Sequence, residues 1–191
     1  MRIGLLGGTF NPVHRGHLLL AQGAQQHLGL HQVLWIPAHL PPHKPLEGNA
    51  TPEDRARMVG LALQGQPGFR LSRVDLDRPP PSYTIETVLL LRRQFPERGN
   101  EWFFLIGSDT ARELPAWREI AKLRKQVTFA AVPRPADPLA GYPEAGVIRL
   151  PVVTANISSS EIRQRVRQGR KICRLVPPGV ARYIEERRLY R

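Results

Sequence analysis

Residues 3–17 read Ile-Gly-Leu-Leu-Gly-Gly-Thr-Phe-Asn-Pro-Val-His-Arg-Gly-His, and this stretch decides the fold class. The apolar run at its start, residues 3–6, predicts a buried strand. Apolar side chains then recur at helical spacing at Leu18, Leu20, Ala21, Ala24 and Leu28. The stretch is therefore the turn from a first strand into a first helix, which is typical of an α/β protein with a parallel sheet.

This first turn has the features of an anion-binding site. Gly7 and Gly8 allow backbone N–H groups to approach an anion closely, and the start of the helix adds a favourable dipole. His14 and His17, three positions apart, then face the same anion. The turn lacks both the Gly-Lys-Ser/Thr of a Walker A loop and the G-x-G-x-x-G spacing of a dinucleotide site. A metal site at the two histidines is the weaker alternative, because no other helix offers a matching set of His, Cys and Glu ligands.

The rest of the chain alternates apolar runs with helical patterns, as βαβ units do. We expect further strands at residues 33–36, 69–74, 102–106, 127–132 and 147–150. Thr51, followed by a proline and two acids, predicts a helix start, and residues 85–95 predict another helix. The expected fold class is α/β, with a Rossmann-like central parallel sheet flanked by helices, in a single domain over residues 1–191.

Composition and charge narrow the class of protein. The net charge is +12, and residues 161–191 contribute +7 of it, with ten basic and three acidic side chains. A basic surface attracts nucleotides or nucleic acid, although arginines spread over a solvated surface explain most of this charge. Cys173 is the only cysteine, so no internal disulfide is expected. Because no apolar run is long enough to cross a bilayer, we expect a cytoplasmic protein without a membrane partner, either monomeric or a homo-oligomer.

The segment His14-Arg15-Gly16-His17 resembles the HxGH motif of the nucleotidyltransferase superfamily. Members of that superfamily join a phosphate or a carboxylate to the α-phosphate of a nucleoside triphosphate. The resemblance implies that the first turn binds ATP, through Gly7, Gly8, Thr9, Phe10 and His17. It also implies catalytic roles for His14 and His17, which would stabilise phosphate charge rather than remove a proton.

A second motif, residues 156–163, reads Asn-Ile-Ser-Ser-Ser-Glu-Ile-Arg. Ser158 and Glu161 have the spacing of a helix capping box, which by itself accounts for Ser158. The additional serines and Arg163, one turn further, add hydroxyls and a guanidinium that suit a phosphate. The segment is similar to the ISS(S/T)xxR pattern of the same superfamily. This similarity implies ATP contacts from Ile157, Ser158, Ser159 and Arg163, with Arg163 catalytic.

Four further segments, residues 41–44, 81–84, 107–109 and 114–117, are similar to the bacterial nicotinate-nucleotide adenylyltransferase family. The match continues to the end of the chain. It implies that Lys44, Tyr83, Thr84 and Trp117 bind the mononucleotide, with the Trp117 indole stacking on the pyridine ring. It also implies that Gly107 and Asp109, which follow the strand expected at 102–106, contact the adenylate.

The reaction implied by this resemblance joins ATP and nicotinate mononucleotide to give the deamido dinucleotide and pyrophosphate. The 5′-phosphate of the mononucleotide has its second pKa near ~6 and is mostly a dianion, so no general base is required. Mg²⁺ is expected to arrive with the triphosphate, keeping several waters, so no metal site built from protein side chains is expected.

Asn11, Asp75 and Asp77 are expected to have no catalytic role. The family most often has Asp where this chain has Asn11, and an amide keeps hydrogen bonding but loses the charge. Asn11 is therefore expected to fix the loop. Asp75 and Asp77 are expected to be solvated loop acids.

Other functions remain as alternatives at this stage. The nearest is a related adenylyltransferase or cytidylyltransferase acting on nicotinamide mononucleotide, phosphopantetheine or a flavin, and a fragment of a class I aminoacyl-tRNA synthetase is more remote. A basic nucleic-acid-binding module is also remote, because the terminal segment lacks aromatic residues placed for base stacking. We expect ATP and nicotinate mononucleotide as partners, and no nucleic acid.

Overall fold

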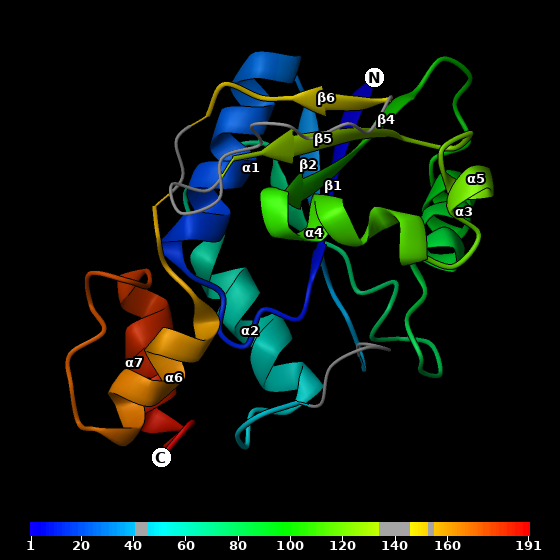
Figure 1. The fold of residues 1–191 in the computed structure, drawn as a ribbon. Coiled ribbons are helices and arrows are strands. Elements are labelled where there is room, and N and C mark those ends of the chain that lie inside the picture. Colours follow the sequence, from blue (N-terminus) through cyan, green and yellow to red (C-terminus); the bar gives the residue numbers. More distant parts are fainter. Residues whose placement is uncertain (41–45, 134–145, 153–154) are drawn as a thin grey trace.

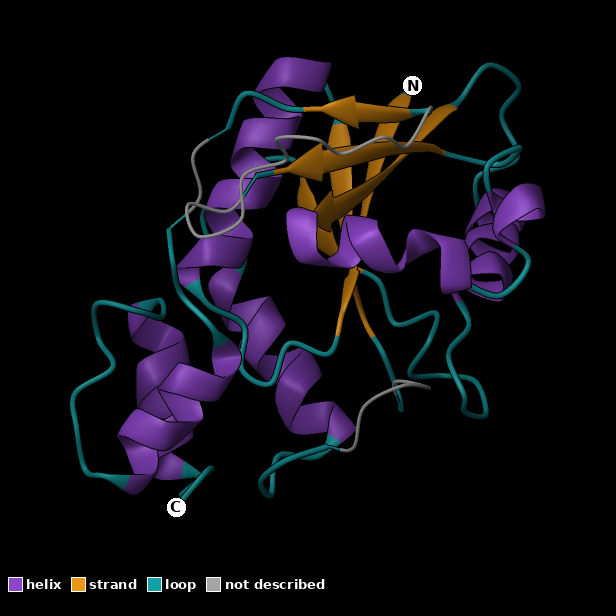
Figure 2. Cartoon of the chain, viewed as in Figure 1, coloured by secondary structure: helices purple, strands orange, loops and turns teal. Residues whose placement is uncertain are grey.

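The computed structural model describes residues 1–40, 46–133, 146–152 and 155–191. A parallel six-stranded sheet forms its centre, in the order β3-β2-β1-β4-β5-β6 (Figures 1 and 2). The strands are β1 (Arg2–Gly8), β2 (Gln32–Pro37), β3 (Phe69–Leu71), β4 (Glu101–Gly107), β5 (Thr128–Val132) and β6 (Val147–Arg149). This arrangement confirms the expected α/β, Rossmann-like fold.

Helices connect the strands and cover both faces of the sheet. The longer ones are α1 (Arg15–Leu28), α2 (Pro52–Ala62), α3 (Thr84–Gln94), α6 (Ser159–Arg167) and α7 (Pro178–Glu186). Three short helices follow β4, namely α4 (Ser108–Glu113), the 3-10 helix η1 (Leu114–Ala116) and α5 (Ile120–Leu123). Among the described residues, no helix is long and apolar enough to span a membrane.

Alternate residues along each strand point to opposite faces, which gives two cores. On one face, Leu5 and Phe104 pack with residues of α3, α4 and α5. On the other face, Leu6 and Leu105 pack with residues of α1, α2, α6 and α7. Figure 1 shows α1 on one side of the sheet and α3 and α5 on the other. Strands buried on both faces read as continuous apolar runs, which is why the sequence identifies them well.

The strand order reverses between β1 and β4, at the centre of the sheet. At that point the two carboxyl ends lie side by side, with Gly8 ending β1 and Gly107 ending β4. Ligands of open α/β sheets bind in the crevice outside such a switch point. The first turn of the sequence therefore opens onto the place where the topology favours a site.

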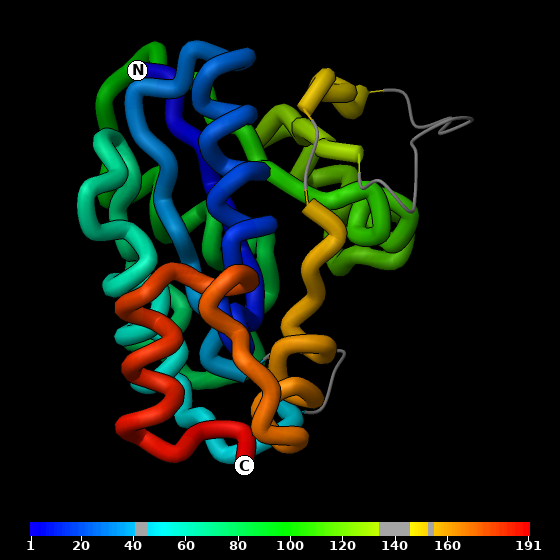
Figure 3. Tube along the Cα trace, turned by 90° about the vertical axis from the view of Figure 1, so that its left-hand side faces the viewer, coloured from blue at the N-terminus to red at the C-terminus, as the bar shows by residue number. Residues whose placement is uncertain are grey.

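The C-terminal helices lie against the first half of the chain. Helix α7 packs on α2, and Figure 3 shows the red C-terminal end beside the cyan segment that precedes α2. The backbone N–H of Arg15 donates to the carbonyl of Leu175 over 2.9 Å, so the chain before α7 also contacts the start of α1.

The strand expected at residues 69–74 is too long in the prediction. β3 ends at Leu71, and the N–H groups of Leu76 and Asp77 bond back to the carbonyl of Arg73 in a turn. Val74 packs against the core from this turn rather than from a strand, which explains its apolar character. The remaining expected strands and helices are present with end differences of one or two residues.

Candidate active site

Helix α1 begins with the two histidines in contact. Their rings stack with centroids 3.7 Å apart, and the backbone N–H of His14 donates to Nδ1 of His17 over 3.2 Å. Space beside Gly16 is tight, since a Cβ at this position would lie 3.0 Å from Nδ1 of His14. His14 is buried and His17 is half-buried, so His17 is the one that reaches the cavity described below.

Arg55 of α2, which was not among the predicted site residues, bonds the backbone of the loop between β1 and α1. Arg55 of α2 is fully buried and donates to the carbonyls of Thr9 (2.8 Å), Ala38 (2.7 Å) and His39 (2.7 Å). Burial lowers the pKa of Arg55. A carbonyl that already bonds a cation repels a phosphate less, so Arg55 makes the loop more favourable for an anion.

The side chain of Phe10 fixes the same loop from within the core. Its backbone adopts a left-handed φ of 48°, which is uncommon for a bulky residue. The buried ring packs edge-on against His17 (5.1 Å between centroids) and beside Trp35 (5.5 Å). Burial of the ring offsets the backbone strain and sets the position of His17.

The second motif meets this loop, as expected from the two halves of the superfamily pattern. Ser158 caps α6 by accepting from the N–H of Glu161 over 3.1 Å, which confirms its expected structural role. The hydroxyl of Ser159 donates to the carbonyl of Pro12 over 2.8 Å. Arg163 donates to the carbonyl of Asn11 over 2.8 Å, across 152 residues of sequence.

The guanidinium of Arg163 also contacts an acid. It is 6% exposed, and its Nη2 lies 2.9 Å from the carboxylate of Glu47 and 3.0 Å from the hydroxyl of Ser160. The hydrogen bond from Arg163 lowers the pKa of the Glu47 carboxyl. The guanidinium of Arg163 therefore bonds a carbonyl, a carboxylate and a hydroxyl of the protein, and the carboxylate is that of Glu47.

Asn11 joins these pieces, and its expected role in fixing the loop is confirmed. Its Oδ1 accepts from the hydroxyl of Tyr190 over 2.7 Å, and its Nδ2 donates to the carbonyl of Glu47 over 2.8 Å. With its own carbonyl bonded to Arg163, Asn11 links four separate segments of the chain.

A cavity of about 570 Å³ lies over the switch point and runs from this loop to α3 and η1. Of the predicted site residues, its lining includes Gly7, Gly8, Thr9, Phe10, His17, Tyr83, Thr84, Gly107, Trp117, Ser159 and Arg163. His14, Asp109, Ile157 and Ser158 are described but are not part of this lining, and Lys44 lies outside the described residues. Asp109 is exposed in the first turn of α4.

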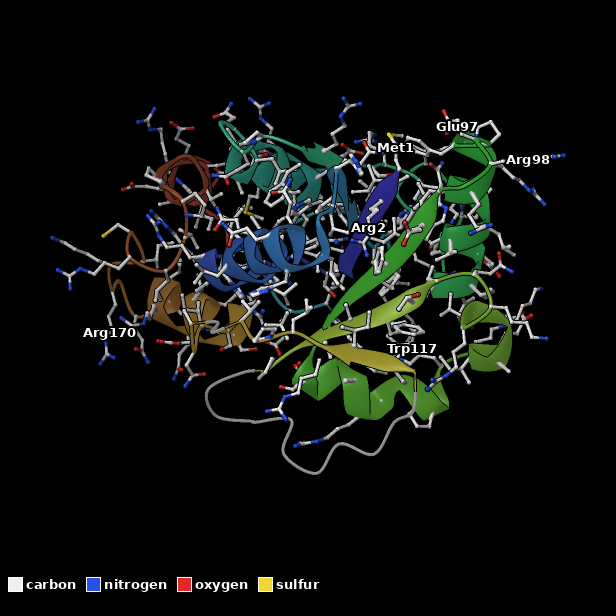
Figure 4. All side chains as sticks on the ribbon, turned by 90° about the horizontal axis from the view of Figure 1, so that it is seen from above. Met1, Arg2, Glu97, Arg98, Trp117 and Arg170 are labelled. Carbon is white, nitrogen blue, oxygen red and sulfur yellow. The ribbon has the colours of Figure 1, made fainter. Side chains whose placement is uncertain are left out.

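The far end of the cavity is aromatic. Trp117 follows η1 and is half-buried, with its ring edge-on to Phe104 (5.7 Å) and Phe129 (6.1 Å). Figure 4 shows Trp117 beside the strands, on the opposite side of the molecule from Arg170, which follows α6. Nearby, the guanidinium of Arg118 lies 4.4 Å from the ring centroid of Tyr83.

Asp75 is not the solvated loop acid that the sequence analysis expected. It is 5% exposed and lines the cavity, and it accepts from the hydroxyl of Thr87 (2.7 Å) and from Nε of Arg78 (3.0 Å). Burial raises the pKa of Asp75, opposed by these two partners. Arg78 also donates to the carbonyl of Tyr83, which lies 3.1 Å from the hydroxyl of Thr87, so the group anchors the turn that carries Tyr83. Asp77 is exposed and pairs with Arg73, as expected of a loop acid.

Periodicity could have found one of the missed residues. Arg55 stands at helical spacing with Met58, Val59 and Ala62, which are all buried, so its place on an apolar face indicated a buried cation. Asp75 had no comparable signal, because its partner Thr87 lies on a separate element. Within the described residues, no group of three His, Cys, Asp or Glu side chains is arranged to hold a metal ion.

The sequence of this chain matches a known family model and curated proteins. Residues 5–165 match a family model described as cytidylyltransferase-like. A protein of Gloeobacter violaceus with the curated name "Probable nicotinate-nucleotide adenylyltransferase" is 44% identical, covering 99% of this chain and 96% of the relative. A protein of the same name from Thermus thermophilus is 46% identical, with full coverage of both chains.

A solved structure also resembles the chain. Nicotinic acid mononucleotide adenylyltransferase of Plasmodium falciparum, complexed with NaAD, superposes with a TM-score of 0.81 at 20% identity, covering 99% of this chain and 97% of that one. At this identity the likeness concerns the fold.

Proposed function

Because the chain belongs to the nicotinate-nucleotide adenylyltransferase family, we propose that it transfers the adenylyl group of ATP to nicotinate mononucleotide. The products are nicotinate adenine dinucleotide and pyrophosphate, a step in NAD biosynthesis. The observation that carries the proposal is that residues of both sequence motifs, His17 and Arg163, line one cavity at the sheet's switch point.

The end of the cavity near α1 and α6 suits the triphosphate. The N-termini of these two helices contribute the positive ends of their dipoles there. His17, Ser159 and Arg163 add side-chain donors there. Arg55, fully buried under the loop, adds a cation that contacts no solvent.

The aromatic end suits the mononucleotide. An indole face can stack on a pyridine ring, and Trp117 stands half-exposed in the cavity wall. Tyr83 is the N-cap of α3 and Thr84 its first residue, and both line this end of the cavity, so the positive end of the helix dipole lies there. A positive end favours an acidic ring substituent over an amide, which supports nicotinate as the preferred acceptor.

The reaction is an in-line displacement at phosphorus. An oxygen of the mononucleotide 5′-phosphate attacks the α-phosphorus of ATP, and the bond from that phosphorus to the oxygen bridging to the β-phosphate breaks. The bridging oxygen leaves with pyrophosphate, and no proton needs to be removed from the nucleophile. The protein aligns two anions and neutralises charge as it develops, with His17 and Arg163 placed for the α-phosphate and the leaving group.

Mg²⁺ is proposed as a companion of ATP. Mg²⁺ keeps several of its waters and binds mainly phosphate oxygens in nucleotide-dependent enzymes, so it needs few protein ligands. When bound, the ion would add to the neutralisation of the leaving pyrophosphate.

A pyrophosphate-release assay tests the proposal. Purified protein is given ATP and Mg²⁺ with nicotinate mononucleotide, nicotinamide mononucleotide, phosphopantetheine or a flavin mononucleotide in turn. We expect rapid release only with the nicotinate compound, and formation of the dinucleotide is verified by chromatography. A higher kcat/KM with any other acceptor would overturn the assignment of substrate.

A further inference from the structure

We propose that Tyr190 is a positioning residue for adenylyl transfer, which acts through Asn11 on the loop that binds the triphosphate. This inference rests on the proposed function. Tyr190 is not part of the described cavity lining, whereas Asn11 is. The hydrogen bond to Asn11 therefore joins the phenol to the cavity lining.

The contact between the two side chains is short and enclosed. The hydroxyl of Tyr190 donates to Oδ1 of Asn11 over 2.7 Å, and the two residues are 2% and 5% exposed. The other end of the amide, Nδ2, donates to the carbonyl of Glu47. Both ends of the Asn11 side chain are bonded, so its orientation is set by these two partners. Burial raises the pKa of Tyr190 well above its usual range, and the phenol thus stays protonated as the donor.

The backbone conformation around Tyr190 and its neighbouring contacts fix the position of this ring. Arg188 and Tyr190 adopt left-handed φ values of 50° and 65°, a conformation that persists only where surrounding contacts hold it. The backbone N–H of Tyr190 donates to Oδ1 of Asn49 over 2.8 Å. The ring also lies directly on the backbone of Gly48, where a Cβ would come within 2.8 Å of its Cδ1.

Asn11 transmits this position to the anion-binding groups. Its carbonyl accepts from Arg163, and the next residue, Pro12, has its carbonyl bonded to Ser159. Loss of the phenol hydroxyl leaves Oδ1 of Asn11 buried without its donor, which favours rotation of the amide away from its present partners. The loop and Arg163 would then sample positions that do not match the triphosphate.

A neighbouring tyrosine offers a matched control. Tyr183 of α7 donates its hydroxyl to Oδ1 of Asp54 over 2.8 Å. Tyr183→Phe removes the same group, with a bond of similar length, from the same terminal segment. The other partners of Asp54 among the described residues are Thr51, at the start of α2, and Arg187, rather than the loop between β1 and α1, so this variant reports loss of stability alone.

The test compares the full-length chain with Tyr190→Phe and Tyr183→Phe. The dissociation constant of a non-hydrolysable ATP analogue is measured by calorimetry, alongside Tm and the KM of each substrate. We expect Tyr190→Phe to weaken analogue binding and raise the KM for ATP about five- to twentyfold, the range for an unsatisfied buried acceptor. The KM for the mononucleotide should change less than twofold, and Tyr183→Phe should lower Tm without affecting analogue binding.

A second comparison isolates the route through Asn11. In an Asn11→Ala background, Tyr190→Phe should have no further effect on analogue binding, because the acceptor is already absent. Additive effects, equal losses toward both substrates, or an analogue affinity equal to that of the wild type would each overturn the inference. Failure of the proposed function would appear separately, as wild-type protein that binds the analogue without forming dinucleotide.

Discussion

The imidazole of His17 accepts a hydrogen bond at Nδ1 from the backbone N–H of His14, while the two rings stack. An acceptor at Nδ1 places the proton of a neutral ring on Nε2. His17 is therefore held as a donor at Nε2, and it lines the cavity beside the loop between β1 and α1. Such a fixed donor suits charge that develops during the reaction.

His17→Ala should lower kcat by about 10²–10³-fold, the usual loss when one preorganised charge stabiliser is removed. The control is His27→Ala, which removes an exposed imidazole from the last turn of the same helix. Steady-state kinetics with both substrates, and Tm for each variant, make the measurement. A kcat within twofold of the wild type would contradict a catalytic role for His17.

Trp117→Ala should raise the KM for the mononucleotide by roughly 5- to 100-fold, since stacking on an aromatic ring contributes about 1–3 kcal/mol. Trp117→Phe should recover most of the loss, because a smaller ring still fits against Phe104 and Phe129. The KM values of the two substrates are compared at saturating concentrations of the other. A defect seen only with ATP would show that the indole does not face the mononucleotide.

Glu47→Gln should lower the KM for ATP about two- to fivefold, because the triphosphate no longer displaces a carboxylate from Arg163. Glu53→Gln serves as the control, since Glu53 is also exposed and pairs with Arg73 at a distance from the cavity lining. Initial rates over a range of ATP concentrations decide the matter. An increase in KM would mean that Glu47 helps to bind the nucleotide.

Asp75→Asn should change the pH dependence of stability. Burial raises the pKa of Asp75, so the folded chain binds its proton more tightly than the unfolded chain does. The contribution of Asp75 to the free energy of unfolding is therefore fully present below the ordinary pKa of about 3.9. It is lost as pH rises through the raised pKa of the folded chain.

Urea denaturation of the wild type and Asp75→Asn, at a series of pH values from about 3.5 to 7, tests this sign. The free energy of unfolding of the wild type, relative to the variant, should decrease as pH rises. An increase over the same range would show that the ion pair with Arg78 outweighs the cost of burial.

Local patterns in the sequence were sufficient for most of the fold. The apolar runs that became β1, β2, β4 and β5 are buried on both faces, so each shows a strong signal within its own residues. Thr51 caps α2 as predicted, because a capping residue and its partner stand three positions apart. The predicted strand at residues 69–74 was too long because it too relied on local apolar character. Val74 is apolar, as a strand residue would be, but it packs against the core from a turn after β3.

The site was only partly predictable, because some of its residues stand in local motifs and others meet only through contacts between distant segments. Gly7, His17 and Arg163 stand in motifs whose spacing is visible, and the fold brings them to one cavity. The contacts of Arg55 with Thr9 and of Tyr190 with Asn11 join residues 46 and 179 positions apart. No local spacing specifies such pairs, because they depend on how whole helices pack against the loop.

The hydrogen bond between Asn11 and Tyr190 also determines when this loop can acquire its full set of contacts during synthesis. A ribosome makes Asn11 152 residues before Arg163 of α6 and 179 residues before Tyr190, which follows α7. A nascent chain therefore has the contacts of Arg55 and Glu47 with this loop long before it has the hydrogen bond from Tyr190. For the same reason, a change in the chain beside the buried Tyr190 would disturb the loop at Asn11, whereas a change at Arg2, at the opposite end of β1 from Gly8, would be remote from that loop.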